Sequence, residues 1–579
     1  MNAPVIPIHV LADPAGPPGP RPQRTRRERP VTAQALAAVR GAIGASPLRR
    51  DLLIELLHAL NDRFGQLQTD HLAALAELLR LSQAEVYEVA SFYHHFDVVR
   101  ENANGGFDAP PRLTVRVCDG LSCEMAGARD LLQRLPALLD ADVRVIAAPC
   151  IGRCEQAPAV AVHQHPVARA TVESVVHAVQ AGLTTHATQE TPPAIGLDAY
   201  QAAGGYQTLA ACLSGQRDVE SVIQSLEHSG LRGLGGAGFP AGRKWRIVRD
   251  QPAPRLMAVN IDEGEPGTFK DRHYLERDPH RFLEGMLLAA WAVGIDAIYI
   301  YLRDEYHGCR ALLERELALL KASAVMAGMP NIATIELRRG AGAYICGEES
   351  AMIESIEGKR GMPRLRPPYV AQVGLFGRPT LAHNFETLFW VRDILEKGGD
   401  WFAGHGRHGR KGLRSFSVSG RVNKPGVHLA PAGITLRELV HEYCGGLPPG
   451  HELYAYLPGG ASGGILPASL ADVPLDFDTL QAHGSFIGSA AIVVLSQHDR
   501  ATDAARNLMA FFEHESCGQC TPCRSGTAKV RELIAGDRWD AALLAELSQV
   551  MRDASICGLG QAAPNPVDSV IKYFPQELA

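Results

Sequence analysis

Residues 230–245 read GLRGLGGAGFPAGRKW, and this glycine-rich string is the most informative segment of the chain. Gly233, Gly235 and Gly238 match the G-x-G-x-x-G pattern of dinucleotide-binding proteins. In an ordinary Rossmann unit the pattern follows a strand, whereas the preceding SVIQSLEHS has helical spacing. An ordinary Rossmann unit is therefore not expected, but bare backbone amides beside Lys244 suit a phosphate group. A flexible glycine-rich turn would give the same string.

Strand-like and helix-like runs alternate downstream of this string. RLMAVN, AIYIYL and ATIELRR have the composition of strands, whereas RFLEGMLLAAWAV and GCRALLERELALLKASA have helical spacing. Such alternation is typical of an α/β domain. We therefore predict an α/β domain over residues 198–405, preceded by a polar, proline-containing linker over 184–197.

Two segments of this predicted domain are acidic. NIDEGEPGTFKD contains Asp262, Glu263 and Glu265 directly after a strand, and GAGAYICGEES places Glu348 and Glu349 before a helix. Open α/β sheets bind ligands at the carboxyl ends of their strands, so both segments are candidates for a binding site. Solvated loop charge is the alternative, because most acidic runs are of that kind.

The flanking regions differ from the α/β domain in their hydrophobic spacing. Helical spacing over residues 46–105 predicts a helical bundle, and the same spacing over 500–579 predicts a C-terminal helical domain. Residues 110–183 alternate strand and helix, which predicts a compact α/β unit. Residues 410–495 combine Gly and Pro with short apolar runs, which predicts a small β-rich domain. Residues 1–45 are predicted to be a disordered tail. The fold class is therefore multidomain α/β.

Composition and charge exclude several classes of protein. Of the 579 residues, 46% are hydrophobic and 21% are charged, and the net charge is −6. These values are typical of soluble globular proteins and not of nucleic-acid-binding ones. The longest apolar stretch, Met286 to Leu302, contains Gly294 and Asp296 and is too short to span a membrane. Since the N-terminus also lacks a signal-peptide pattern, we expect a cytoplasmic protein with no nucleic-acid partner and no direct membrane insertion.

The C-terminal cysteine site consists of Cys517, Cys520, Cys523 and Cys557, in the strings ESCGQCTPCRSG and SICGLGQ. Three thiolates at a repeat of three, joined by a fourth from a distant segment, are the arrangement that a 4Fe-4S cluster requires. A structural zinc ion is the alternative, although zinc sites more often use paired C-x-x-C elements. The spacing therefore favours an iron-sulfur cluster.

The early cysteine site consists of Cys118 and Cys123 in CDGLSC and of Cys150 and Cys154 in CIGRC. Each pair follows a predicted strand, and two loops that meet at one end of a sheet can offer four thiolates to a 2Fe-2S cluster. Zinc is again the alternative. In a chain without a secretion signal, such grouping argues for metal ligation over disulfide bonds.

Together these strings resemble the flavin- and NADH-binding subunit of respiratory complex I and its relatives in NAD-reducing hydrogenases and NAD-dependent formate dehydrogenases. The resemblance runs from about Gln207 to the C-terminus. Residues 46–182, with ASFYHHF and the early cysteine site, are similar to the family's small thioredoxin-like 2Fe-2S subunit. The resemblance implies an FMN- and NADH-binding fold for 198–405 and a ubiquitin-like fold for 410–495. The implied cofactors are FMN, NAD(H), one 4Fe-4S cluster and one 2Fe-2S cluster.

Carried over residue by residue, the resemblance implies roles at the nucleotide site. Gly235, Gly236 and Lys244 would hold the FMN phosphate. Asn260, Asp262 and Gly347 would lie along the flavin, and Asn384 would contact the FMN side of the site. Phe239 and Tyr369 would stack on the adenine of NADH. Glu265 and Glu349 would bond the polar groups of NADH and are the catalytic candidates. The predicted cofactor-binding residues are Gly233, Gly235, Gly236, Gly238, Phe239, Lys244, Asn260, Asp262, Glu263, Glu265, Tyr344, Gly347, Glu348, Glu349, Arg366, Tyr369, His383 and Asn384.

The sequence departs from the family pattern at three positions. Ile247 stands where the family often has an aromatic residue, His383 where it has Asn and Arg366 where it has Lys. These departures affect the expected cofactor affinity and leave the expected chemistry unchanged. Cys346 is expected to be structural.

The resemblance also implies an electron route and a partner. NADH gives two electrons as a hydride, flavin converts them to single electrons, and the 4Fe-4S cluster passes them to a partner. YIYLRDEY and LPGGASGGILPASLADVPLDF are most similar to the β subunit of NAD-dependent formate dehydrogenase, whose α subunit carries a tungsten- or molybdenum-pterin and further iron-sulfur clusters. The implied reaction is reduction of NAD+. The alternatives are a hydrogenase diaphorase subunit, the NADH-oxidising subunit of complex I and a zinc-bound scaffold.

Overall fold

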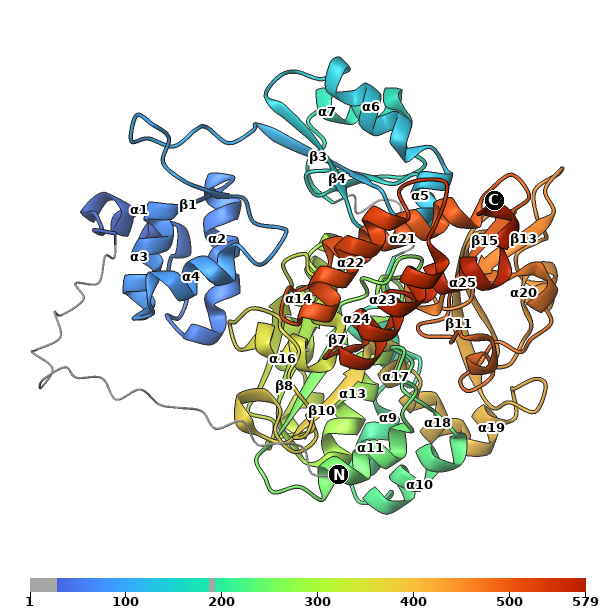
Figure 1. Ribbon diagram of the computed structural model, residues 1–579. Helices are drawn as coiled ribbons and strands as arrows, with labels where there is room; N and C mark the ends of the chain where they lie inside the picture. Colours follow the sequence, from blue (N-terminus) through green and yellow to red (C-terminus); the bar gives the residue numbers. More distant parts are fainter. Residues whose placement is uncertain (1–28, 187–192, 579) are drawn as a thin grey trace, which may run out of the picture.

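A computed structural model describes residues 29–186 and 193–578 of the chain (Figure 1). A helical bundle and a small α/β domain form the N-terminal part, and a central α/β domain, a β-rich domain and a C-terminal helical domain follow. Residues 1–28 of the predicted tail (1–45) and residues 187–192 of the predicted linker (184–197) lie outside the described residues.

The helical bundle begins earlier than the sequence predicted. Its helices are α1 (Ala33–Ile43), α2 (Leu53–Phe64), α3 (Thr69–Leu79) and α4 (Gln83–Ala90). Helix α1 occupies part of the segment that was predicted to be a disordered tail. The Thr32 side chain caps this helix by accepting a hydrogen bond from the Ala35 amide. Ala35, Val39 and Ile43, at helical spacing, are buried in the bundle, so tertiary packing orders the segment.

The small α/β domain has a four-stranded mixed sheet in the order β4-β3-β5-β6. Strand β3 runs parallel to β4 and antiparallel to β5. Helices α6 and α7 pack on the sheet, and the short helix α5 follows β3 directly. The bounds are β3 (Leu113–Cys118), α5 (Leu121–Met125), α6 (Ala128–Leu138), β4 (Val143–Ala148), β5 (Val160–Val162), β6 (His165–Val167) and α7 (Val172–Gln180).

The central domain is built on a parallel four-stranded sheet in the order β10-β7-β8-β9. Both faces of the sheet are buried. Met257 and Val259 pack on the side of α13, whereas Ala258 and Tyr301 pack with the bundle and the C-terminal helices. The bounds are β7 (Arg255–Ile261), α13 (Pro279–Val293), β8 (Ile295–Leu302), α14 (His307–Ala322), β9 (Thr334–Arg339), α16 (Glu349–Ile356) and β10 (Thr380–Asn384).

Shorter helices surround this sheet and position the glycine-rich string. That string lies between α10 and α11, so a helix precedes it, as the sequence predicted. The bounds are α8 (Leu197–Ala202), α9 (Gln207–Leu213), α10 (Val219–Ser229), α11 (Ala241–Arg249), α12 (Lys270–Leu275), α17 (Phe385–Phe389), α18 (Val391–Lys397) and α19 (Gly399–Ala403).

The β-rich domain has a five-stranded mixed sheet in the order β12-β11-β15-β13-β14. Five helices, α21 to α25, complete the chain and lie between the small α/β domain and the central domain (Figure 1). The bounds are β11 (Leu413–Gly420), β12 (Gly426–Pro431), α20 (Leu436–Glu442), β13 (Leu453–Leu457), β14 (Leu466–Pro467), β15 (Ala491–Ser496), α21 (Ala501–His514), α22 (Thr521–Leu533), α23 (Ala541–Ala554), α24 (Gly558–Ala562) and α25 (Asn565–Tyr573).

Within the part of the chain that the structure describes, none of the helices combines the length and the apolar character needed to cross a membrane.

Candidate functional site

The early cysteine site is assembled at the carboxyl ends of β3 and β4. Cys118 ends β3, Cys123 lies in α5, and Cys150 and Cys154 follow β4. All four side chains are buried and line one small cavity, and the Sγ atoms of Cys150 and Cys154 are 3.4 Å apart. Hydrogen bonds from the Cys118 and Cys154 thiols lower the pKa of Cys150 well below its ordinary value. Four convergent sulfurs, one of them favoured as a thiolate, fit the ligand set of a 2Fe-2S cluster.

The central domain closes the early cysteine site from the other side. Arg303 Nη2 donates a hydrogen bond to the Cys150 carbonyl at 2.7 Å, and Arg272 Nε donates one to the Gly152 carbonyl at 2.9 Å. Both arginines are buried. Gly152 has φ +72°, and a Cβ atom there would lie 2.4 Å from Tyr306 Oη. Only glycine therefore fits where the cysteine loop meets the central domain.

The C-terminal cysteine site lies where two helices begin. Cys517 and Cys520 precede α22, Cys523 lies in its first turn, and Cys557 occupies the N-cap position of α24. The four side chains line one small cavity together with Ile345 of the central domain. Burial raises the pKa of Cys557 to about 11, and no cation of the protein lies in the cavity lining among the described residues. Bound iron would therefore supply the charge that stabilises four thiolates, as a 4Fe-4S cluster does.

The glycine-rich string packs tightly against its surroundings. A Cβ atom at Gly235 would lie 2.9 Å from the Asn384 side chain, and one at Gly238, where φ is +65°, would lie 2.6 Å from Phe477. Lys244, in α11, reaches the Ala382 carbonyl at 3.1 Å and Glu349 at 3.9 Å. Burial lowers the pKa of Lys244, and an anion in contact with this ammonium group would favour its charged form.

The carboxyl ends of β7 and β10 bring together a second group of predicted residues. Asn260 pairs with Asn384 in the sheet, and its Nδ2 donates to the Gly347 carbonyl at 2.8 Å. Asp262 Oδ2 is buried without a hydrogen-bond partner among the described residues. A buried carboxylate oxygen left in this state is costly. A polar ligand such as flavin, which carries an N–H donor, would satisfy it, so the residues present fit FMN.

Glu265 and Tyr344 form the wall between the nucleotide site and the β-rich domain. The Tyr344 hydroxyl donates to Glu265, and the Ser462 amide donates to the same carboxylate at 2.8 Å. Burial raises the pKa of Glu265. Tyr344 is held in turn because its amide donates to Glu515 at 2.9 Å. The carboxylate is thus fixed at the carboxyl edge of the sheet, where ligands bind in open α/β domains.

Phe239 and Tyr369 are large aromatic side chains that remain accessible. Their exposed fractions are 38% and 56%, respectively. Most aromatic rings of this size are buried, so exposed rings at the rim of a site are suited to stacking on a base. Arg366 pairs with Glu348 and, at 3.1 Å, with Glu349. Glu348 also caps α16 by accepting from the Ser350 and Ala351 amides.

Two predicted cofactor-binding residues, Glu263 and His383, make hydrogen bonds within the protein itself. Glu263 is buried and accepts hydrogen bonds from the Asp271 and Arg272 amides at the start of α12. His383 is buried and accepts a hydrogen bond from Trp245 Nε1 at 2.8 Å. Their assignment as cofactor contacts stays a prediction. Gly233 and Gly236 lie in the turn between α10 and α11, as expected.

Four further residues of the site were not predicted from the sequence: Ser462, Glu515, Arg272 and Arg303. Arg303 and Arg272 lie 153 and 120 positions from the loop they hold, and Ser462 lies 197 positions from Glu265. Sequence spacing gives no signal for such distant pairs. The one available indication for Arg303 was its position directly after the strand-like run AIYIYL.

Comparisons with protein-family models match three parts of the chain. Residues 226–393 match the Nuo51 FMN-binding domain, residues 503–579 match the NADH-ubiquinone oxidoreductase-F iron-sulfur binding region, and residues 39–182 match the thioredoxin-like [2Fe-2S] ferredoxin model. The NADH-quinone oxidoreductase F 2 subunit of Rhizobium meliloti (strain 1021) is 41% identical over 393 residues, which are 66% of this chain and 93% of that protein. The chain belongs to the family of NADH-quinone oxidoreductase F subunits.

Other F subunits and a solved structure agree with this family assignment. The NADH-quinone oxidoreductase F subunit of Rickettsia massiliae (strain Mtu5) is 41% identical over 392 residues, covering 65% of this chain and 91% of that protein. A chain of the NAD+-reducing [NiFe]-hydrogenase in the H2-reduced state superposes with a TM-score of 0.77 and 33% identity. That match covers 91% of this chain and 92% of the hydrogenase chain, so it includes the region N-terminal to the FMN-binding domain.

The family matches confirm the predicted fold class and cofactors. This member of the F-subunit family combines a thioredoxin-like 2Fe-2S domain, an FMN-binding α/β domain and a C-terminal 4Fe-4S region. Its cofactors are FMN, NAD(H), one 2Fe-2S cluster and one 4Fe-4S cluster. The matches favour iron-sulfur clusters over the zinc alternative at both cysteine sites. The chain is an NAD(H)-dependent flavin and iron-sulfur oxidoreductase subunit.

Proposed function

We propose that this member of the F-subunit family is the diaphorase subunit of an NAD-dependent formate dehydrogenase. Electrons from a formate-oxidising partner subunit reach NAD+ through this chain. The partner carries a tungsten- or molybdenum-pterin centre and further iron-sulfur clusters. The proposal places the reduction of NAD+ on this chain and the oxidation of formate on the partner.

One observation supports the electron-transfer role above all others. The cavity of the early cysteine site is lined by Pro266 and Gly267, directly after Glu265. The cavity of the C-terminal cysteine site is lined by Ile345, directly after Tyr344. Both cysteine sites therefore border the two loops that meet at the Glu265–Tyr344 pair of the nucleotide site.

Bound FMN supplies the exchange between two-electron hydride chemistry and one-electron transfer. The residues of this chain bind and orient the nucleotides in this proposal. Lys244 and the glycine amides hold phosphate, and Asp262 accepts a hydrogen bond from the flavin. Phe239 and Tyr369 stack on the base of NADH, while Glu265 and Glu349 orient its polar groups.

The resemblance of YIYLRDEY and LPGGASGGILPASLADVPLDF to formate dehydrogenase β subunits supports formate as the substrate of the complex. A diaphorase subunit of an NAD-reducing hydrogenase is the second candidate. It is favoured by the superposition on the NAD+-reducing [NiFe]-hydrogenase, which extends over the fused N-terminal region.

The test is NAD+ reduction by the complex purified anaerobically through a tag on this chain. Formate and hydrogen are offered separately, and a Cys557→Ala complex serves as the control in which the route to the partner is interrupted. Formate-dependent NADH formation that the control lacks supports the proposal. Hydrogen-dependent NADH formation supports the second candidate. If neither formate nor hydrogen drives NADH formation but NADH still reduces a dye, both proposed partners are contradicted and only the diaphorase activity stands.

A further inference from the structure

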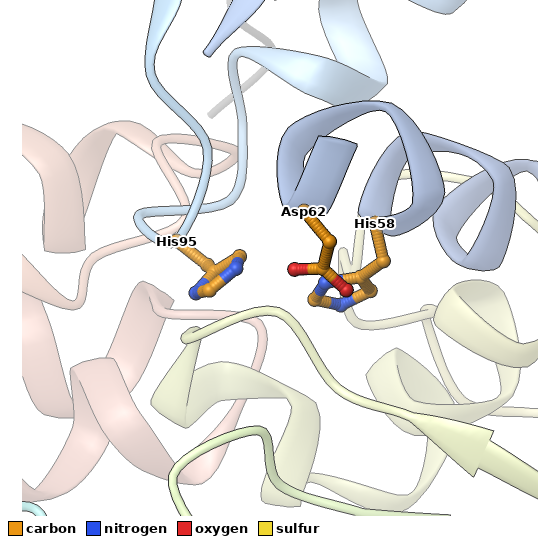
Figure 2. Close-up of side chains that lie close together, drawn as sticks. All are labelled: His58, Asp62 and His95. Carbon is orange, nitrogen blue, oxygen red and sulfur yellow. The ribbon is translucent and has the colours of Figure 1, made fainter. Parts of the chain in front are cut away.

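A cluster of two histidines and an aspartate lies outside the nucleotide and cysteine sites. His58 and Asp62 project from one face of α2, one helical turn apart, and His95 projects from the loop after α4 (Figure 2). One ring nitrogen of each histidine and one carboxylate oxygen of Asp62 all lie within 4.8 Å of one another. The three side chains face each other where the helical bundle meets the central domain (Figure 2).

The hydrogen bonds of the two histidines fix which ring nitrogen carries a lone pair. His58 Nε2 donates to the Gly340 carbonyl at 2.8 Å, so its Nδ1 carries a lone pair. His95 Nδ1 donates to Asp304 at 2.9 Å, so in the neutral ring the lone pair lies on Nε2. Asn61 Nδ2 lies 3.5 Å from that Nε2 atom. Metal-binding histidines have this arrangement, in which one nitrogen donates to a carbonyl or carboxylate and the other faces the ion.

His58 Nδ1 gives an independent indication of a ligand. The atom is buried and has no hydrogen-bond partner among the described residues, and His58 as a whole is 2% exposed. A buried polar atom without a partner costs free energy. Because His58 Nε2 is occupied by its hydrogen bond to the Gly340 carbonyl, Nδ1 is the ring atom that can bind a ligand.

The cluster is closed on one side and open on the other. Asp62 and His95 line a cavity of about 1040 Å³ that lies between the bundle, the small α/β domain and the central domain. The Asp62 side chain is 45% exposed, and its Oδ2 pairs with Arg339 at 2.7 Å, so Oδ1 is the carboxylate oxygen that is not used in this ion pair. Water from the cavity can occupy a fourth position.

We propose that His58 Nδ1, Asp62 Oδ1 and His95 Nε2 form a binding site for a divalent transition-metal ion such as Zn2+. Two imidazoles and one carboxylate are ligands that Zn2+ takes, and a fourth position held by water completes a tetrahedral set. Tetrahedral zinc ligands lie about 3.4 Å apart, so the carboxylate moves inward on binding. Asp304 and the Gly340 carbonyl belong to the central domain and orient the two histidines, so metal binding stabilises the contact between that domain and the bundle.

The experiment measures Zn2+ binding to the full holoprotein under anaerobic conditions. The protein is freed of loosely bound metal with a mild chelator and titrated with Zn2+ alone. Zinc content per FMN and the cluster absorbance are recorded on the same samples. We expect one Zn2+ per chain and a rise in the thermal transition temperature, while the cluster absorbance stays constant.

Variants locate the bound ion. Asp62→Asn and His95→Gln are expected to weaken Zn2+ binding at least about 10-fold and to abolish the thermal shift. His177→Gln, which changes an exposed histidine of α7, is the matched control and keeps wild-type binding. His58 is buried and its replacement can disturb folding, so the partly exposed Asp62 carries the test. Absence of Zn2+ binding, unchanged affinity in Asp62→Asn, or zinc uptake that bleaches the clusters would each overturn the proposal.

Discussion

The early and C-terminal cysteine sites differ in burial and in their surroundings. All four cysteines of the early site are buried, whereas only Cys523 is buried in the C-terminal site. Two buried arginines of the central domain donate hydrogen bonds to the loop of the early site. In the C-terminal site, Cys520 is the N-cap of α22 and Cys557 that of α24.

This difference indicates different roles for the two clusters. A cluster enclosed by two domains and held by arginine donors exchanges little with solvent, and its potential depends on the central domain. A cluster whose ligands are partly exposed lies closer to a surface at which a partner subunit can dock. We therefore expect the C-terminal site to be the exit or entry point for electrons.

The largest effect is expected for Cys557→Ala. Loss of one of four ligands removes the 4Fe-4S cluster, so its EPR signal and electron transfer to the partner disappear, while flavin reduction by NADH persists. Cys444→Ala is the control, because it also removes one thiol, but Cys444 belongs to neither cysteine site. A 4Fe-4S signal of normal intensity in Cys557→Ala would show that the C-terminal site has been assigned incorrectly.

A second large effect is expected for Gly152→Ala at the early site. The added Cβ would lie 2.4 Å from Tyr306 Oη at φ +72°, so the loop has to move and the 2Fe-2S signal is reduced several-fold or lost. Gly127→Ala also introduces a side chain at positive φ, but nothing lies within 4 Å of its Cβ. The measurement is the intensity of the 2Fe-2S EPR signal in both variants, with the 4Fe-4S signal of the same sample as the internal reference. Equal 2Fe-2S signals would contradict the proposed contact.

A smaller effect is expected for Arg303→Gln. Removing the charge and the hydrogen bond to the Cys150 carbonyl is expected to lower the 2Fe-2S reduction potential by about 60 mV, which is a tenfold change for one electron. The 4Fe-4S potential is expected to stay constant. Arg310→Gln is the control, because Arg310 pairs with Asp304 and makes no hydrogen bond to the cysteine loop among the described residues. The measurement is an EPR-monitored redox titration, and parallel shifts of both clusters would refute a local effect.

The smallest effects are expected at the nucleotide site. Glu265→Ala raises the KM for NADH about 10-fold and Phe239→Ala raises it roughly 3- to 10-fold, since an aromatic contact contributes about 0.5–1.5 kcal/mol. FMN content and both cluster signals stay unchanged. Leu138→Ala, which removes an exposed apolar side chain of α6, is the control for steady-state kinetics. Unchanged KM values in Glu265→Ala and Phe239→Ala would remove these residues from the site.

The parts that could be predicted from the sequence depend on local patterns. Cys517, Cys520 and Cys523 lie within seven residues, and alternating strands and helices define the central sheet. The glycine-rich string and the helix that precedes it were also predicted from the local sequence. Each of these features is contained in a short window of the chain.

The parts that could not be predicted depend on contacts between distant segments. Arg303 reaches the Cys150 carbonyl across 153 positions, and His58 reaches the Gly340 carbonyl across 282. Helix α1 was assigned to a tail because its neighbours are rich in Pro and Arg, yet Val39 is fully buried by packing in the bundle. Composition does not reveal such packing, because burial of a helix depends on the surface of the other helices against which it packs.

Cofactor analysis of the full chain tests the central claim most directly. The chain is purified anaerobically, its FMN, iron and zinc contents are measured, and EPR spectra are recorded after reduction with NADH. The account predicts one FMN and iron for one 2Fe-2S and one 4Fe-4S cluster per chain, with cluster signals that appear on NADH addition. A colourless protein that holds zinc at both cysteine sites and does not react with NADH would contradict it.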